Sequence, residues 1–435
     1  MTRRSVTRAG SVVITERSDA LPIVGISATL RSGTLLDPHG KEGLVRMLGR
    51  ALRMGTSELR GERLEEKLDE LGAQLSIAAS QSFVNIGGVV VAHNLEPFVE
   101  LLADVLLRPA MRDTDLRQVR RELRAELAAS CDDDRSLCFR HLRSHAFPDQ
   151  LQGRPRSGTL ASLGRITRSD LVKHHKRHVT GPNVVFGVWG DFAPKQLAKL
   201  LDQHFGALPK KVVPALQLPE PSVPRGRRIL IVDKPERSQT QIAVATLGSH
   251  PGESSHIPLI VANTAFGGLF SSRLNEEVRV KRGLSYGASS SVTVGKARDL
   301  WAMHTFPSAK DAASCLQLQL DLFDRWVEGG ITAEELARSK SYLEKSHAFE
   351  VDTPSKRLDQ DLDIELLGFP KRYHSHFVQE VKRVGLKDVK LALKQGGLAL
   401  GSQVIVIVAT AKELKAQLAK IPGVTSIETV PFDRV

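Results

Sequence analysis

The sequence predicts two similar α+β units joined by a proline-rich linker. Residues 211–226 contain four prolines and no hydrophobic periodicity, which is typical of a semi-rigid linker. The halves on either side have similar lengths and present the same kinds of segment in the same order. A duplicated unit is the simplest explanation of this repetition. We therefore predict homologous domains over residues 1–210 and 227–435, separated by the linker.

The individual elements follow from local patterns. Strands are expected where apolar residues alternate or run together, and helices where apolar residues recur every three to four positions. A Thr or Asp before acidic residues marks the start of a helix. The matched elements, first half then second, are strands at 83–91 and within 230–248, amphipathic helices at 95–107 and 312–330, capped helix starts at 111–123 and 331–343, and strand–helix pairs at 183–205 and 402–418.

The composition indicates an ordinary globular protein, with 41% hydrophobic and 25% charged residues. The net charge is +12, but the basic residues are scattered and no nucleic-acid-binding motif accompanies them, so we do not expect nucleic acid as a partner. No apolar run approaches the length of a membrane span, and the N-terminus lacks the apolar core of a signal peptide. Three cysteines without C-x-x-C spacing favour a reducing compartment. We therefore expect a cytoplasmic protein without membrane contact.

Residues 43–56, GLVRMLGRALRMGT, predict a helix with one buried stripe at Leu44, Leu48 and Leu52. Its other face carries Arg46, Gly49 and Arg50 at spacings of three and four. A metallopeptidase helix would place metal ligands at this spacing.

The chain resembles the insulinase/pitrilysin-like metallopeptidases in the order of three segments, namely this helix, LDELGAQLSIAAS and RRELRAELAASCDDD. The resemblance covers the chain from about Val12 onwards. That family carries an inverted zinc motif, H-x-x-E-H. The resemblance implies that Arg46 and Arg50 replace the two histidines and Gly49 the catalytic glutamate, whereas Glu126 matches the third ligand. Arginine has no lone pair to offer a metal, and glycine cannot act as a base. We therefore expect no zinc in this chain.

Glu126 is left without its metal, and we predict that it pairs with Arg46 or Arg50 so that an ion pair links the two helices. The alternative is that Glu126 is a solvent-facing helix residue. Cys138, His141 and His145 could share one helix face, but a fourth ligand is missing and we do not expect a metal site there.

The stretch LFSSRLNEEVRVKRGLSYGASSS (269–291) predicts a helix capped by Ser271 or Ser272, an end at Gly283 and a following strand. It also resembles the same family, in which an Arg and a Tyr at this spacing hold the scissile peptide and its tetrahedral intermediate. The resemblance implies these roles for Arg279 and Tyr286. From the residues alone, a surface arginine and a half-buried strand tyrosine remain the alternative.

A third segment, GAQLSIAAS, predicts a strand. In the family this strand is a sheet edge that pairs with peptide substrates, a mode that reads backbone groups. The implied substrate-binding residues are Gly72, Ala73, Gln74, Leu75 and Ser76. An ordinary strand is the alternative.

The resemblance implies two α/β sandwich domains, each an antiparallel-rich sheet packed by helices, that form one half of a clamshell. It also implies a heterodimer. A homologous partner with an intact H-x-x-E-H motif would hold zinc, and this chain would supply Arg279 and Tyr286 in trans for the cleavage of enclosed peptides. Two alternatives stay open, namely an inert structural or assembly subunit and a peptide-binding homodimer.

Overall fold

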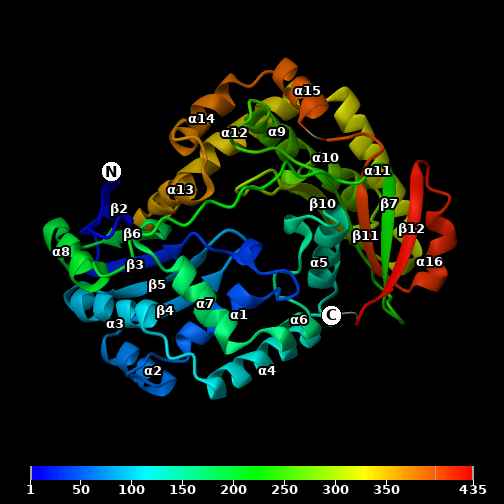
Figure 1. Cartoon of the computed structure of the whole chain (residues 1–435). Helices are drawn as coiled ribbons and strands as arrows, with labels where there is room; N and C mark the ends of the chain where they lie inside the picture. Colours follow the sequence, from blue (N-terminus) through cyan, green and yellow to red (C-terminus); the bar gives the residue numbers. More distant parts are fainter. Residues whose placement is uncertain (1, 397, 434–435) are drawn as a thin grey trace. The chain divides into compact units, whose positions relative to one another are not determined.

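Each half of the duplication builds one six-stranded sheet in the computed structural model, which describes residues 2–396 and 398–433 (Figure 1). Contacts along the chain divide it into two compact units. Unit 1 comprises Met1–Leu127, Pro155–Gln217 and Phe349–Gly368, and unit 2 comprises Ala128–Arg154, Leu218–Ala348 and Phe369–Val435.

The sheet of unit 1 has the strand order β1-β2-β6-β3-β5-β4. Strands β2 and β6 are parallel, and all other neighbours in this sheet are antiparallel. The strands are β1 (Arg3–Val6), β2 (Val12–Arg17), β3 (Ile23–Leu30), β4 (Gln74–Ala79), β5 (Val84–Val91) and β6 (Val184–Gly190).

The sheet of unit 2 repeats this pattern in the order β12-β7-β11-β8-β10-β9. Strands β7 and β11 are parallel, like β2 and β6, and the pairs from β11 to β9 are antiparallel, like those from β6 to β4. The strands are β7 (Arg227–Asp233), β8 (Gln241–Leu247), β9 (Ser285–Val292), β10 (Leu300–Pro307), β11 (Val404–Ala409) and β12 (Val424–Pro431). Five consecutive strands therefore correspond, which supports the duplication read from the sequence. The outermost strands differ, because β1 is antiparallel to β2 whereas β12 is parallel to β7.

Helices pack against these sheets through apolar faces. In unit 1 they are α1 (Leu44–Arg53), α2 (Gly61–Glu70), α3 (Leu95–Leu107), α4 (Asp113–Ala129), α6 (Leu160–Arg165), α7 (Arg168–His178), α8 (Pro194–Phe205) and α13 (Pro354–Leu367). In unit 2 they are α5 (Asp134–Ala146), α9 (His256–Asn263), α10 (Arg273–Asn275), α11 (Ala312–Gly329), α12 (Ala333–Ser346), α14 (Tyr373–Arg383), α15 (Leu386–Gln395) and α16 (Ala411–Leu418). The amphipathic helices predicted at 95–107 and 312–330 are α3 and α11.

Two helices pack on the sheet of the opposite half of the sequence. Helix α5 precedes the linker but buries Leu137, Cys138 and Leu142 against β8 and β11 of unit 2 (Figure 1). Helix α13 follows the linker but packs through Leu358 and Leu362 on β2 and β6 of unit 1. The compact units thus differ from the division predicted at residues 210 and 227 by one exchanged helix each.

Buried ion pairs hold α5 in unit 2. Lys234, at the end of β7, donates to the Cys131 carbonyl at 2.8 Å and to the Asp134 carboxylate at 2.6 Å, directly at the start of α5. Arg143 and Asp299 form a bidentate pair in which both distances are 2.9 Å. Because these charges are largely buried, removal of one partner from either pair would weaken the packing of α5 in unit 2.

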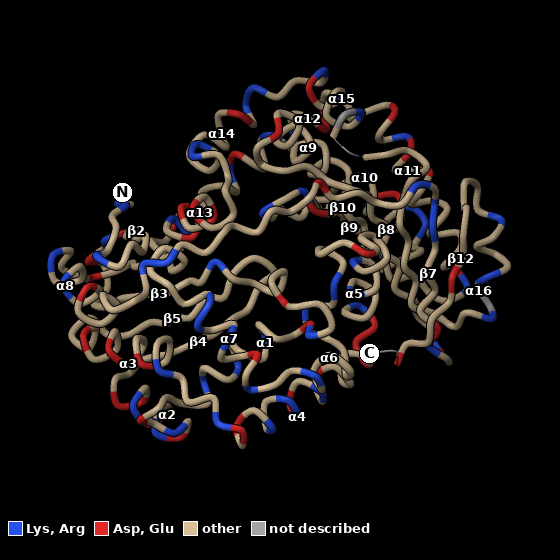
Figure 2. The backbone as a smooth tube through the Cα atoms, in the orientation of Figure 1, with Lys and Arg blue, Asp and Glu red and all other residues tan. Residues whose placement is uncertain are grey.

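Lys and Arg are distributed over the helices of both units and are interspersed with Asp and Glu (Figure 2). Among the described residues, no helix is long and apolar enough to cross a membrane.

Candidate functional site

Helix α1 presents the altered motif on a well-defined start. Gly43 adopts a left-handed conformation with φ of 91°, and the Asp37 carboxylate accepts the backbone N–H groups of Gly43 at 2.7 Å and Val45 at 2.8 Å. These bonds satisfy donors that a helix start leaves free. Leu44, Leu48 and Leu52 are buried, as the stripe predicted, so the helix is fixed in rotation.

The opposite face of α1 brings the two arginines of the motif to Glu126 on α4. Arg46 Nη2 lies 2.6 Å from Glu126 Oε2, and Arg50 Nη2 lies 2.7 Å from Glu126 Oε1. Arg46 also donates to the Ser157 hydroxyl. The predicted ion pair is thus present. Glu126 was expected to pair with Arg46 or Arg50, and it pairs with both. One carboxylate now joins α1 to α4 through two guanidinium groups.

The residues of this site do not fit zinc. Two of the three altered positions carry cations without an acceptor atom, and the third, Gly49, has no side chain. Among the described residues, no group of three or more His, Cys, Asp or Glu could hold a metal ion. Cys138 is fully buried beneath the unit 2 sheet, and this burial raises the pKa of its thiol. The altered motif on α1 therefore lacks the donor atoms that a catalytic zinc ion needs.

Strand β4 is an edge strand of unit 1, as predicted for the segment 72–80. Of the proposed peptide-binding residues, Gln74, Leu75 and Ser76 lie in β4, whereas Gly72 and Ala73 lie in the turn before it. Arg53 of α1 donates to the Leu75 carbonyl at 2.6 Å and forms a bidentate pair with Glu65 of α2.

A hollow of about 490 Å³ adjoins this end of β4. Its walls include the charged side chains of Arg53, Glu65 and Asp69. The edge strand thus lies beside a polar recess, and peptide binding there stays a prediction.

In unit 2 the structure brings Arg279 and Tyr286 together. The Arg279 guanidinium carbon lies 4.5 Å from the centre of the Tyr286 ring. Arg279 belongs to a π-helical turn, Glu276–Lys281, and Gly283 with φ of 61° turns the chain into the edge strand β9. The helix end and the strand start predicted around Gly283 therefore place the two side chains at one point.

Phe270 completes this arrangement and was missed by the sequence analysis. Its ring centre lies 4.8 Å from the Arg279 guanidinium carbon, so two aromatic rings flank one cation. Phe270 and Tyr286 are 70% and 78% exposed, which is unusual for large aromatic side chains. A phenylalanine within the polar, glycine-containing stretch GGLFSS was the only available signal.

Neighbouring charges leave Arg279 free for a ligand. Glu277, the nearest acidic residue along the turn, pairs with Lys281 at 2.8 Å and also with Arg282. These two cations lower the pKa of Glu277. Within the described part of the chain, Arg279 makes no ion pair of its own. Its guanidinium carbon lies close to both rings, and its N–H groups remain available for an anionic or carbonyl oxygen.

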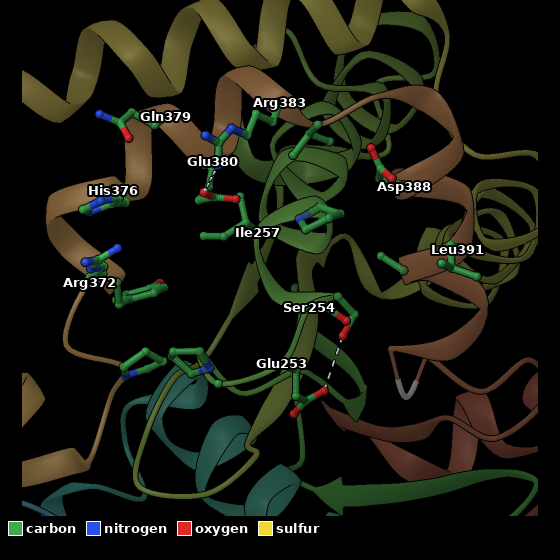
Figure 3. A pocket seen from close by; sticks show the side chains of 18 residues that line it. Glu253, Ser254, Ile257, Arg372, His376, Gln379, Glu380, Arg383, Asp388 and Leu391 are labelled. Atoms are coloured by element: carbon green, nitrogen blue, oxygen red, sulfur yellow. Dashed lines mark hydrogen bonds and ion pairs between the residues drawn. The ribbon is translucent and has the colours of Figure 1, made fainter.

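A hollow of about 880 Å³ in unit 2 lies among α9, α14 and α15 (Figure 3). Four of the charged side chains that line it are engaged within the protein. Arg383 pairs with Glu380 at 2.7 Å, Glu253 pairs with Arg298, and Asp388 accepts the Gly385 N–H at the start of α15. No residue predicted to be functional lines it.

Two family models match this chain. Residues 12–160 match the family described as insulinase (peptidase family M16), and residues 165–343 match the family described as the peptidase M16 inactive domain. The chain belongs to the M16 peptidase family. The predicted resemblance is therefore confirmed, and so is the two-domain α+β fold.

Relatives of this M16 chain differ in their names. An uncharacterized zinc protease of Mycobacterium bovis is 23% identical, with 92% of this chain and 93% of the relative covered. A non-peptidase homolog of Helicobacter pylori, YmxG, is 22% identical over 91% of each chain. The family thus includes members named as proteases and members named as non-peptidases.

Comparison with solved structures confirms the fold. A peptidase M16 inactive domain from Pseudomonas fluorescens superposes with a TM-score of 0.87 at 23% identity, covering 94% of this chain and 98% of that one. A chain of complex III2 from Candida albicans gives a TM-score of 0.80 at 17% identity, covering 96% and 99%.

Proposed function

We propose that this M16 chain is the zinc-less subunit of a heterodimeric peptidase. A homologous partner with an intact H-x-x-E-H motif would hold the zinc ion and its catalytic glutamate. This chain would contribute Arg279 and Tyr286 in trans, and alone it would have no peptidase activity. The observation that carries the proposal is the exposed Phe270–Arg279–Tyr286 cluster, retained in a chain whose own zinc motif is lost.

The chemistry of the cluster suits peptide hydrolysis. Attack on a peptide carbonyl places negative charge on its oxygen, and donors already aimed at that position lower the barrier. The Arg279 guanidinium would supply a charged donor and the Tyr286 hydroxyl a neutral one. Zinc in the partner would supply the activated water. Contact with the two rings limits the rotamers of Arg279, so little reorganisation would accompany the reaction.

The edge position of β4 supports a role in binding substrates. An extended peptide can add to the open edge of β4 through main-chain hydrogen bonds, which select for unfolded segments without requiring a sequence. Residues Gln74, Leu75 and Ser76 would then contact the substrate, and the turn at Gly72 and Ala73 would bound the site.

The test is isolation of the tagged chain from its native host, with mass spectrometry of any stoichiometric partner. We expect a chain of similar size that carries H-x-x-E-H. In the reconstituted pair, Arg279→Ala and Tyr286→Phe should each lower kcat by about 10²–10³-fold, the effect of removing one oxyanion donor. Arg325→Ala and Tyr342→Phe, which change exposed residues of the same types elsewhere in unit 2, should leave activity intact.

Two other results would favour other functions. A partner whose activity ignores Arg279 and Tyr286 would indicate an assembly subunit, a role consistent with the shared fold of the complex III2 chain. Recovery of a homodimer that binds extended peptides would indicate a peptide-binding protein.

A further inference from the structure

Helix α1 and strand β4 run alongside each other with matching repeats. A Cβ at Gly49 would lie 3.5 Å from Ile77 Cγ2, and Arg53 contacts the Leu75 carbonyl. Four helical residues advance about 6 Å and two strand residues advance about 6.7 Å. The row Arg46–Arg50–Arg53 on α1 therefore follows β4 in the opposite direction.

One end of this row, Arg53, lies at the open edge of β4. The Gln74 carbonyl faces β5, because a Cβ at Gly88 would come within 1.6 Å of its oxygen. Carbonyl groups alternate in direction along a strand, so the Leu75 carbonyl points away from β5. Arg53 donates to this outward carbonyl at 2.6 Å, which places this end of the arginine row beside the edge that an added peptide strand would occupy.

The charges along this row do not balance. Arg53 and Glu65 neutralise each other through two bonds of 2.9 Å. Glu126 is shared between Arg46 and Arg50, so one carboxylate faces two guanidinium groups. One positive charge is left over. Arg50 is the more accessible of the pair, with half of its side chain exposed, and among the described residues its only hydrogen bond is the one from Nη2 to Glu126.

We propose that Arg50, supported by Arg46, binds the carboxylate of a peptide that pairs with the edge of β4. A guanidinium group offers parallel N–H donors that match a carboxylate, and Arg50 retains unused donors beside the peptide path. The carboxylate can be the C-terminus of the peptide or an Asp or Glu side chain. The altered zinc motif would thus have exchanged a metal for an anion-binding role.

The inference rests on peptide binding at β4 from the proposed function, but not on Arg279 or Tyr286. If the inference fails while Arg279→Ala still lowers the activity of the reconstituted pair as expected, the proposed function stands. If the carboxylate preference holds while Arg279→Ala has no effect, the site exists in a peptide-binding or assembly protein.

The experiment measures fluorescence anisotropy of the full-length chain with three labelled peptides of one extended apolar core. One has a free C-terminus, one has a C-terminal amide, and one has the amide and an internal Glu. We expect a carboxylate to improve affinity about tenfold over the amide, as a charge-assisted hydrogen bond predicts. The free acid and the internal Glu distinguish the two sources. The preference should weaken as salt is raised.

Variants assign the preference to Arg50. Arg50→Gln should lower the affinity for the carboxylate peptides to that for the amide peptide, and it should leave the affinity for the amide peptide unchanged. Arg50→Lys, which keeps the charge but loses the fork, should retain part of the preference. Glu126→Gln should have the opposite effect and raise affinity for the carboxylates several-fold, because it removes the competing anion. Arg63→Gln, which alters an exposed arginine of α2 paired with Glu66, is the matched control.

Equal binding of the three peptides by the wild-type chain would overturn the inference, as would failure of all three to bind. An equal loss for acid and amide peptides in Arg50→Gln would show a structural effect instead. Thermal unfolding of each variant, measured alongside, separates misfolding from loss of the site.

Discussion

Removal of Glu126 should destabilise unit 1 more than removal of either arginine that it binds. Glu126→Ala breaks both ion pairs between α1 and α4 and leaves Arg46 and Arg50 as like charges one helical turn apart. Arg50→Gln breaks one pair but also removes the excess charge, while Arg46 keeps Glu126 in place. Glu126→Ala and Arg50→Gln should therefore differ in stability, although each removes a member of the same cluster.

The exposure of the three side chains sets the magnitude. Arg46, Arg50 and Glu126 are 34%, 50% and 37% exposed, so solvent screens both pairs. Pairs of this kind contribute about 0.2–1 kcal/mol each, and like charges at this helical spacing cost about 0.2–0.5 kcal/mol. Glu126→Ala should therefore cost about 1 kcal/mol, or about 2–4 °C in Tm for a unit of this size. Arg50→Gln should change the free energy of unfolding by close to zero.

Thermal unfolding followed by circular dichroism at low and high salt would measure these effects. Amide hydrogen exchange of α1 would locate them, because weakened contacts raise local opening. Glu122→Ala, one turn earlier on α4, is the matched control, since Glu122 accepts a local hydrogen bond from Gln118 and has no ion pair among the described residues. Equal destabilisation by Glu126→Ala and Arg50→Gln, or none by Glu126→Ala, would refute the charge argument. Loss of the effect at high salt would support it.

Further predictions concern the aromatic cluster, acid stability and the exchanged helix. Phe270→Ala should lower kcat of the reconstituted pair about two- to fivefold, the value of an exposed cation–π contact, with Phe270→Trp restoring it and KM unchanged. Burial lowers the pKa of His174 to about 3 and of His178 to about 4, so unit 1 should lose stability as pH falls from about 6.5 towards 4, and His178→Leu should reduce that loss in acid unfolding curves. Asp299→Ala should destabilise unit 2 by about 3 kcal/mol in urea unfolding, because it removes the bidentate carboxylate partner of the largely buried Arg143 side chain.

Each of these has a result that would contradict it. An unchanged kcat in Phe270→Ala would show that Arg279 needs no ring to hold it. Identical acid profiles for wild type and His178→Leu would place the acid sensitivity in other groups. Asp299→Ala should cost more than Lys420→Met, an exposed change in the same unit, and equal values would argue against a buried pair.

The duplication could be predicted from short-range periodicity and from the matched order of the elements. The edge position of β4 and the place of Glu126 beside Arg46 and Arg50 were implied by the family resemblance, and the ion pair followed because buried or half-buried charges need compensation. The partners of α5 and α13 could not be predicted, because an apolar stripe shows that a helix is buried but not which sheet buries it. Phe270 was missed because exposure depends on the path of the surrounding loop.

The exchange of α5 and α13 has a consequence for the order in which the chain folds during synthesis. The outer apolar surface of β2 and β6 is covered by Leu358, Leu362 and Leu366, which the ribosome makes after most of unit 2. The apolar surface of β2 and β6 therefore stays exposed on the nascent chain until residue 367, the end of α13, has left the ribosome. Expression of residues 1–210 alone should give an aggregation-prone fragment, and co-expression with the remaining chain should rescue it. The linker is thus a poor place to cut this protein, although the sequence marks it as the boundary.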